Sequence, residues 1–317
     1  MRKTESRTLL YLIDASVYVF RAYHSPLPEM LDAERRPVHA VFGFARFIGD
    51  LLERTRPQFV AVAFDRRLSR SYRSEIYPPY KAHREPAPPD LAAQFDYCRE
   101  LCERLGLAVF VDSYYEADDL IGTLAQRMRG HGVRSAFITR DKDLAQLVRD
   151  GDLYWDFGAR GQLGYRDVER LFGVAPERFA DYLALTGDTS DNIPGVPGVG
   201  PKTAAALMRA FGSIDELYAG LARVPELGLR GGRDLRERLR EHRDAVYLAR
   251  RLTRIVCDMP LVAGPAELSP RVPDREALGA LYDRLGFGPL LRRQGERLVE
   301  LAAAGGGRGG TAGTALA

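Results

Sequence analysis

Residues 8–14, TLLYLID, form a short apolar run that ends in an aspartate. Similar runs recur further along the chain, at 58–65 (QFVAVAFD), 107–112 (LAVFVD), 134–141 (RSAFITRD) and 153–158 (LYWDFG). Between these runs, apolar residues recur at the spacing of a helix, at 41–54, 90–105 and 116–130. Strands that alternate with helices predict an α/β fold with a mostly parallel sheet flanked by helices.

The pattern changes after about residue 165, where helical segments replace the alternation. A chain of 317 residues is long enough for two domains. We expect an α/β core over 1–175, which includes the segment 66–90, and a helical domain over 176–298. Residues 299–317 contain the low-complexity run AAAGGGRGGTAGTALA and are predicted to be a disordered tail.

The composition is that of an ordinary globular protein, with 45% hydrophobic residues and a net charge of +3. No apolar run approaches the roughly 18 residues of a membrane span, and the N-terminus has no signal-peptide pattern. We therefore expect a cytoplasmic protein with no membrane partner. The three cysteines, Cys98, Cys102 and Cys257, are too few for a disulfide framework and are predicted to be buried apolar residues.

Acidic residues gather where predicted strands end. Asp14, Asp65 and Asp141 each close such a run. Because ligands bind at the carboxyl ends of strands in an open parallel sheet, we expect these acids to converge on one crevice. The motifs YYEADDL, TRDKD and TGDTSDN add Glu116, Asp118, Asp119, Asp143, Asp188 and Asp191. Any one of these acids alone is also explained as a turn residue, a helix cap or a partner of a helix dipole.

Taken together, the nine acids predict a metal site. Like charges in one crevice repel each other, and bound cations remove that cost. These motifs contain no His or Cys, so the ligands are hard oxygens that suit Mg²⁺ or Mn²⁺ rather than Zn²⁺. More carboxylates than one ion needs indicate two ions, and two-metal sites serve phosphodiester hydrolysis. The pattern favours a metal-dependent nuclease.

The stretch GVPGVGPKTAAALMRAFG, at 195–212, places a glycine-rich loop before a helix. Pro201 suits the first helical position and Gly212 the end. Glycines let backbone N–H groups approach a phosphate, and the helix N-terminus favours its charge. This predicts a helix–hairpin–helix that grips a DNA backbone, with contacts from Gly195, Val196, Gly198, Val199, Gly200, Lys202 and Thr203. A Walker-type loop is disfavoured because no strand precedes the glycines; a plain helix–turn–helix corner is the other alternative.

Residues 66–90 are basic, aromatic and Pro-rich. Basic residues interleaved with aromatic ones suit single-stranded nucleic acid, although a solvated loop is the alternative. The segment begins one residue after Asp65, so we expect it to overhang the crevice. Lys81 or Arg84 would then stabilise charge on the scissile phosphate.

These motifs resemble the bacterial 5′-3′ exonucleases of the flap-endonuclease superfamily, including the nuclease domain at the N-terminus of bacterial DNA polymerase I. The carrying motifs are LIDAS, VAFD, RSEIYPPYKAHR, YEADDLIGTLA, TRDKDLAQLV and LTGDTSDNIPGVPGVGPKTA. The resemblance implies a PIN-like α/β core, a helical arch at about 66–90 and a helix–hairpin–helix (H3TH) DNA clamp. It also implies a K⁺ ion bound by carbonyls near 196–199.

The resemblance also implies roles for single residues. All nine acids would be metal ligands or their immediate neighbours. Asp14, Asp65, Glu116 and Asp118 would serve a first ion, and Asp143, Asp188 and Asp191 a second ion, with Asp119 and Asp141 between them. Arg73, Lys81 and Arg84 match arch and gateway residues, and Tyr77 matches a stacking position.

Three motifs depart from the family's usual pattern. The chain has TRDKD, with Arg140, where the family often has TGDKD. At the end of the second run it has the more basic FDRRLSR where FDAKG-like residues are common. At 37–40 it has PVHA where PTGA is usual. No acid is lost. We therefore hypothesise a metal-dependent 5′-3′ exonuclease and 5′-flap endonuclease that acts on branched DNA and is compatible with RNA–DNA hybrids. The alternatives are a non-catalytic DNA-junction binder and an RNA-directed PIN-type ribonuclease, which the glycine loop disfavours.

Overall fold

A computed structural model describes residues 8–26, 30–66, 71–159 and 161–306, with side chains up to residue 304. Within these ranges the strands form one five-stranded parallel sheet in the order β3-β2-β1-β4-β5. The strands are β1 (Leu9–Asp14), β2 (Phe59–Phe64), β3 (Ala108–Val111), β4 (Arg134–Ile138) and β5 (Leu153–Trp155). The prediction of a parallel α/β sheet is confirmed.

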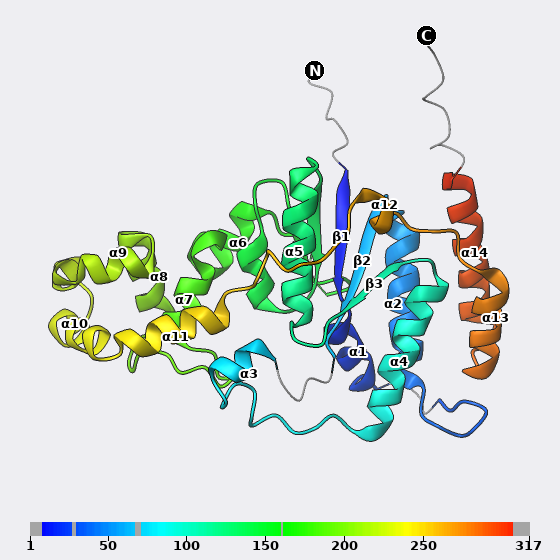
Figure 1. Cartoon of the computed structure of the whole chain (residues 1–317), viewed down its shortest axis with the longest axis horizontal. Coiled ribbons are helices and arrows are strands. Elements are labelled where there is room, and N and C mark those ends of the chain that lie inside the picture. Colours follow the sequence, from blue (N-terminus) through cyan, green and yellow to red (C-terminus); the bar gives the residue numbers. More distant parts are fainter. Residues whose placement is uncertain (1–7, 27–29, 67–70, 160, 307–317) are drawn as a thin grey trace, which may run out of the picture.

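Helices cover both faces of the sheet (Figure 1). Helices α1 (Ala15–Tyr23), α2 (His39–Thr55) and α4 (Pro89–Arg104) lie on one face, and α5 (Ala117–Gly130) lies on the other. Side chains of β2 alternate between the two cores: Phe59, Ala61 and Ala63 join the α5 side, and Val60, Val62 and Phe64 join the opposite side. This alternation explains why a strand buried on both faces reads as a continuous apolar run. Cys98 and Cys102 are buried on α4, as expected, whereas Cys257 is only partly buried.

The expected helical region begins after β5. It contains α6 (Tyr165–Phe172), α7 (Phe179–Thr186), α8 (Pro201–Phe211), α9 (Ile214–Ala219), α10 (Gly232–Glu241) and α11 (Arg243–Thr253), with the 3-10 helices η2 (Pro176–Arg178) and η3 (Leu221–Leu227). Its buried residues, such as Phe179 and Leu207, belong to the same apolar cluster as Leu124 and Met128 of α5. The helical region therefore shares a core with one face of the sheet.

The last helices return to the sheet. After α12 (Pro265–Leu268), the helices α13 (Arg275–Arg284) and α14 (Pro289–Gly306) lie beside α2 and α4 at the far side of the molecule (Figure 1). Leu281 and Leu298 are buried in the cluster that contains Phe44 of α2. The assignment of all residues up to 298 to the helical domain is therefore corrected. The predicted start of a disordered tail is also wrong, because α14 continues to Gly306; residues 307–317 lie outside the described residues.

The segment 66–90 contains α3 (Tyr72–Ile76), followed by turns that lead to α4. Its described part has no long arching helix, and residues 67–70 lie outside the described residues. The expected arch is therefore, as far as it is described, one short helix and a run of turns.

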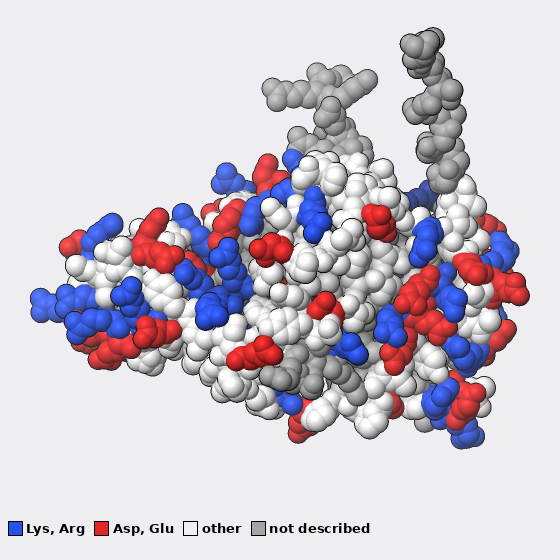
Figure 2. Space-filling view, viewed as in Figure 1, with Lys and Arg blue, Asp and Glu red and all other residues white. Residues whose placement is uncertain are grey.

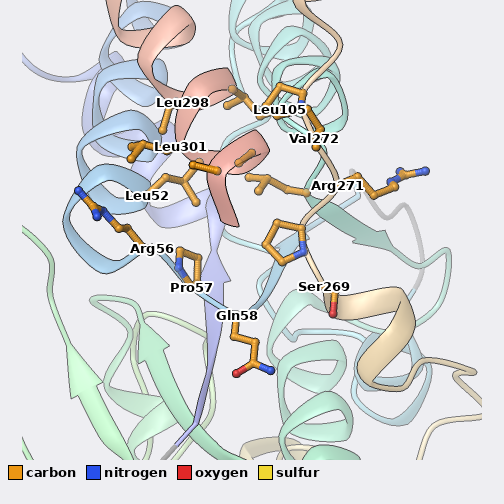
Figure 3. Close-up of a pocket in the computed structure, with 15 residues that line it drawn as sticks. Leu52, Arg56, Pro57, Gln58, Leu105, Ser269, Arg271, Val272, Leu298 and Leu301 are labelled. Carbon is orange, nitrogen blue, oxygen red and sulfur yellow. The ribbon is translucent and has the colours of Figure 1, made fainter. Parts of the chain in front are cut away.

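An apolar groove of about 820 Å³ lies between α2, α4, α14 and the segment before α13 (Figure 3). Leu52, Leu105, Val272 and Leu298 line it, together with Pro57 just before β2. A position just before β2 is at the amino end of the parallel strands. The groove is therefore at the opposite end of the sheet from the acids that close β1 and β2.

Candidate active site

The carboxyl ends of the central strands bring the first acids together. Asp14 is the last residue of β1, Asp65 directly follows β2, and Asp141 lies three residues after β4. In the sheet, β2 and β4 are the two neighbours of β1. Asp14 is buried, and its Oδ2 accepts a hydrogen bond from Thr139 Oγ1 at 2.9 Å. Burial, and then the negative charges of Asp65 and Asp141, raise the pKa of Asp14 to about 8. The predicted convergence of these three acids is what the structure shows.

The acids of the EADD motif lie at the N-terminus of α5. Asp65 Oδ1 accepts the N–H of Ala117 at 2.8 Å, which links the end of β2 to the start of this helix. Asp119 Oδ2 accepts the N–H of Glu116 at 3.2 Å, so Asp119 closes a capping box. The helix start is thereby held against the strand ends, with Glu116 and Asp118 beside the same crevice.

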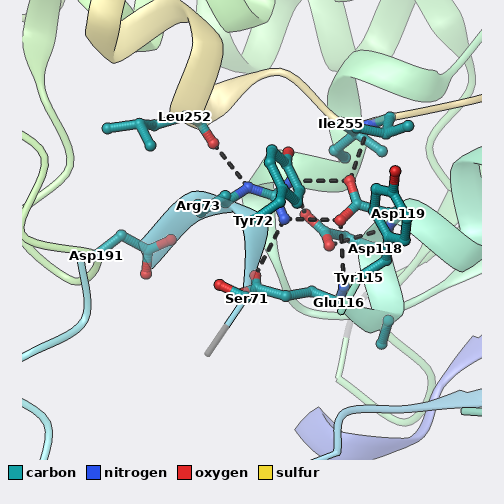
Figure 4. A network of polar contacts seen from close by, with 12 residues as sticks. Ser71, Tyr72, Arg73, Tyr115, Glu116, Asp118, Asp119, Asp191, Leu252 and Ile255 are labelled. Carbon is teal, nitrogen blue, oxygen red and sulfur yellow. Dashed lines mark hydrogen bonds and ion pairs between the residues drawn. The ribbon is translucent and has the colours of Figure 1, made fainter. Parts of the chain in front are cut away.

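Arg73 binds these acids from the opposite side (Figure 4). Its Nη1 donates to Asp119 Oδ2 at 2.7 Å, its Nη2 donates to Asp119 Oδ1 at 2.9 Å, and Nη2 also donates to Asp118 at 3.2 Å. Its Nε donates to the Leu252 carbonyl at 2.9 Å. The side chain is only 1% exposed. The prediction that Arg73 contacts DNA is therefore wrong for this conformation, because its donors are used inside the protein.

Asp119 has no free oxygen for an ion. It is fully buried, Arg73 binds both of its carboxylate oxygens, and Oδ1 also accepts the Val256 N–H at 2.8 Å. The structure thus corrects the expected ligand role of Asp119: this residue positions Arg73 and the start of α5. For Asp118, burial raises the pKa well above its usual range, and the charge of Arg73 opposes that shift.

The second group of acids lies around the 3-10 helix η1 (Lys142–Leu147). Asp141 caps it by accepting the Asp143 N–H at 2.9 Å. Asp143 Oδ1 is buried without a hydrogen-bond donor, and burial, then Asp141, raise the pKa of Asp143 to about 8. Burial alone would raise the pKa of Asp188, but hydrogen bonds from Lys142 and Ser190 lower it.

Besides Arg73, three side chains of the segment 72–84 bind the acids. Lys81 Nζ lies 2.8 Å from Glu116 and 3.8 Å from Asp191. Arg84 Nη2 donates to Asp191 Oδ1 at 2.6 Å, and Tyr80 Oη lies 3.0 Å from both Glu116 and Asp191. The expected overhang of this segment is therefore what the structure shows.

Sequence reasoning missed Tyr80 as a site residue. Its signal was its place beside Lys81, but an aromatic residue in a polar loop does not reveal that its hydroxyl bridges two acids. Tyr77, expected to stack on a base, is half-buried against the core.

The donor set fits a hard divalent cation. The crevice offers carboxylate oxygens, two carboxyl groups whose pKa is raised to about 8, and one buried oxygen, Asp143 Oδ1, that accepts no hydrogen bond and lies 3.6 Å from Lys142 Nζ. In the conformation described, however, no three His, Cys, Asp or Glu side chains lie close enough to hold one ion within the described ranges. Lys81, Lys142 and Arg84 instead bind several of the acids.

The glycine loop directly follows the loop that carries Asp188 and Asp191 in the chain. An antiparallel bridge between Asp188 and Ile193 closes the loop that carries both acids. A Cβ atom at Gly195 would lie 2.3 Å from the Thr186 carbonyl carbon, so only glycine fits there. Val196 and Val199 are buried anchors, while Gly198, Gly200 and Lys202 are exposed. The side chains of the two valines therefore pack inward, and their N–H groups donate to the Leu185 and Val196 carbonyls at 2.9 Å, so only their carbonyl oxygens are left to reach a ligand.

Residues 9–172 match the family model of the 5′-3′ exonuclease N-terminal resolvase-like domain, and residues 174–276 match that of the 5′-3′ exonuclease C-terminal SAM fold. The chain belongs to the 5′-3′ exonuclease family. The predicted PIN-like core with a second, helical domain is thereby confirmed.

Curated relatives of this chain are DNA polymerases. It is 39% identical over 284 residues to DNA polymerase I of Pseudomonas aeruginosa, which covers 89% of the chain and 31% of that protein. It is 36% identical over 310 residues to DNA polymerase I of Mycobacterium leprae, which covers 96% of the chain and 32% of that protein. The chain thus spans about a third of the length of these relatives.

Solved structures share the fold. The T5 D15 protein co-crystallised with metal ions matches with a TM-score of 0.63 and 20% identity, over 93% of this chain and 100% of that chain. The catalytic core of Rad2 in complex with DNA substrate matches with a TM-score of 0.58 and 18% identity, over 93% and 92%. At this level of identity the likeness establishes the fold.

Arg140, the residue by which TRDKD departs from the usual motif, has its Nε atom 3.3 Å from Asp156 Oδ2. Asp156 directly follows β5, so the charge of Arg140 is paired with an acid outside the predicted metal set.

Among the described helices, none has the length and apolar character needed to cross a membrane.

Proposed function

We propose that this chain is a metal-dependent 5′-3′ exonuclease and structure-specific 5′-flap endonuclease that hydrolyses DNA phosphodiester bonds in replication or repair. The observation that carries the proposal is the crevice at the strand ends, where Asp14 and Asp143 are buried beside other carboxylates, so that burial and then the neighbouring negative charges raise the pKa of both. Family membership and relatives named DNA polymerase I support it.

The acids would hold two divalent ions, Mg²⁺ or Mn²⁺. Asp14, Asp65, Glu116 and Asp118 would serve one ion, and Asp143, Asp188 and Asp191 the other, with Asp141 between them. Such ions supply an activated water nucleophile and stabilise the oxygen that leaves, and cutting would leave a 5′-phosphate.

The chain's own cations would complete the site. Lys81 and Arg84 form ion pairs with acids of the site. Both side chains would move to the scissile phosphate when divalent ions bind these carboxylates instead. The hairpin at 195–203 would hold the duplex through backbone N–H groups and Lys202. A K⁺ ion at the carbonyls near 196–199 and the expected cytoplasmic location are parts of the same proposal.

A 5′-labelled DNA flap tests the proposal. We expect cutting near the junction in Mg²⁺ and none in EDTA, with an RNA flap of the same shape cut poorly. Tight flap binding with no product in Mg²⁺ or Mn²⁺ would support a DNA-junction binder instead. Preferred cutting of the RNA strand would support a PIN-type ribonuclease.

A further inference from the structure

Arg238 on α10 has an unusual environment. Its Nε atom is buried and has no hydrogen-bond partner, and within the described ranges no acid forms an ion pair with its guanidinium. The neighbouring arginines of the same helix, Arg236 and Arg240, both bind Glu237. A buried donor left unpaired destabilises the fold, so native proteins rarely keep one without a reason.

The guanidinium of Arg238 lies against the glycine hairpin. A Cβ atom placed on Gly198 would lie 3.6 Å from Arg238 Nη2 and 3.7 Å from its Cζ and Nε. Gly198 has a φ of +75°, which the hairpin needs and which excludes most other residues. Arg238 therefore contacts the loop that the proposed function assigns to a DNA backbone, although it comes from a helix about 40 residues further along the chain.

Backbone donors at the same place are also unpaired. In the part of the chain that the structure describes, the N–H groups of Gly198 and Gly200 donate to no protein acceptor. Helix α8 begins at Pro201 without a side-chain cap, so the N–H groups of Lys202 and Thr203 have no partner either. Unpaired donors from two separate elements thus meet at one hairpin.

We infer that Arg238 and the hairpin bind the same DNA phosphate, which makes α10 part of the DNA-binding surface. A phosphate offers several acceptor oxygens, and a guanidinium is the side chain best shaped to share them with backbone donors. Figure 2 shows Lys and Arg side chains at the end of the molecule formed by α9 and α10, next to Asp and Glu side chains, and these exposed cations suit an approaching duplex. This inference rests on the proposed function of the hairpin.

Methylphosphonate scanning tests the inference. A neutral methylphosphonate is placed at one backbone position at a time in a flap with a long duplex arm, and binding is measured in EDTA with the full chain. For the unmodified protein we expect one position in the duplex at which affinity falls about tenfold. For Arg238→Ala we expect about tenfold weaker binding to the natural flap, a salt slope lower by about one, and a clearly smaller further loss at that position, because only the hairpin's donors are left to bind that phosphate.

Matched variants separate the possible outcomes. Arg240→Ala removes one arginine from the same helix and should keep the sensitive position, and Arg238→Lys should retain part of the affinity. Thermal melting of each variant checks that it is folded. An equally large loss at the same position in folded Arg238→Ala would overturn the inference while leaving the proposed function intact. Failure of the unmodified protein to bind or cut any flap would overturn the proposed function itself.

Discussion

Lys142 Nζ lies 2.6 Å from Asp188 Oδ2, so a lysine of η1 binds the first acid of the loop that leads to the glycine hairpin. Lys81 makes a similar bridge between Glu116 and Asp191. Each lysine thus links the sheet side of the crevice to the loop 188–193. In the proposed function, divalent ions compete with these two ammonium groups for the same oxygens.

Replacing Lys142 tests this competition. Lys142→Ala should lower the free energy of unfolding in EDTA by about 1 kcal/mol, a small effect because the lysine side chain is 44% exposed. Mg²⁺ should then raise the melting temperature of the variant more than that of the unmodified protein, because the ion no longer displaces an ammonium group. Lys202→Ala, which removes an exposed lysine at the hairpin, is the control. An equal Mg²⁺ effect in all three proteins would contradict the competition.

Arg73 should contribute to the stability of the folded protein. Arg73→Met leaves Asp118 and Asp119 buried without their partner, and we expect a loss of about 3–5 kcal/mol in urea unfolding. Arg84→Ala, at the half-exposed end of the same segment, should cost less than about 1 kcal/mol. Similar losses for both variants would show that burial does not distinguish the two arginines.

Asp141 should matter for cutting rather than for DNA binding. In Asp141→Asn the side-chain oxygen still accepts the Asp143 N–H, so the start of η1 is retained while one ligand charge is lost. We expect single-turnover cutting of a labelled flap in Mg²⁺ to fall by about 10³-fold or more, with binding in Ca²⁺ nearly unchanged. Weak binding combined with normal cutting of the bound flap would refute this role.

The metal-free protein should lose stability as pH rises. The pKa of Asp14 is raised to about 8, above its usual value near 3.8, and that of Asp143 is raised similarly. Between about pH 4 and pH 8 the folded protein therefore holds protons that the unfolded chain has released, so the free energy of unfolding falls across this window and levels off above it. Urea titrations in EDTA measure this. Asp14→Asn should flatten the decline, and an unchanged slope in that variant would contradict the assignment.

Lys202 should contact a phosphate of the duplex. Lys202→Ala should weaken duplex binding and lower the slope of log K against log salt by about one unit. Arg297→Ala, on α14 beside α2, removes one positive charge at the other end of the molecule and should leave the slope as it is. A slope that does not change in Lys202→Ala would exclude the phosphate contact.

Much of the fold could be predicted because its signals are local. The strands are short apolar runs that end at or near an aspartate. In the helices between them, the apolar residues recur at the helical period. The candidate site was less predictable. The sequence placed Arg73 among DNA contacts, yet its partners are 45 and 46 residues away at α5 and 179 residues away at Leu252. The alanine- and glycine-rich run that starts at 302 suggested disorder. Part of it nevertheless extends helix α14, whose earlier turns are packed into the core through Leu298.

The sequence by itself determined the parallel sheet, the acids at its carboxyl ends and the hairpin before α8, because each follows from residues that are neighbours along the chain. Only the tertiary structure decided which cation binds which acid, that Asp119 positions Arg73, and that Arg238 lies on Gly198. Those pairings depend on the packing of elements far apart in sequence, since a charged side chain takes the partner that folding brings within reach of it.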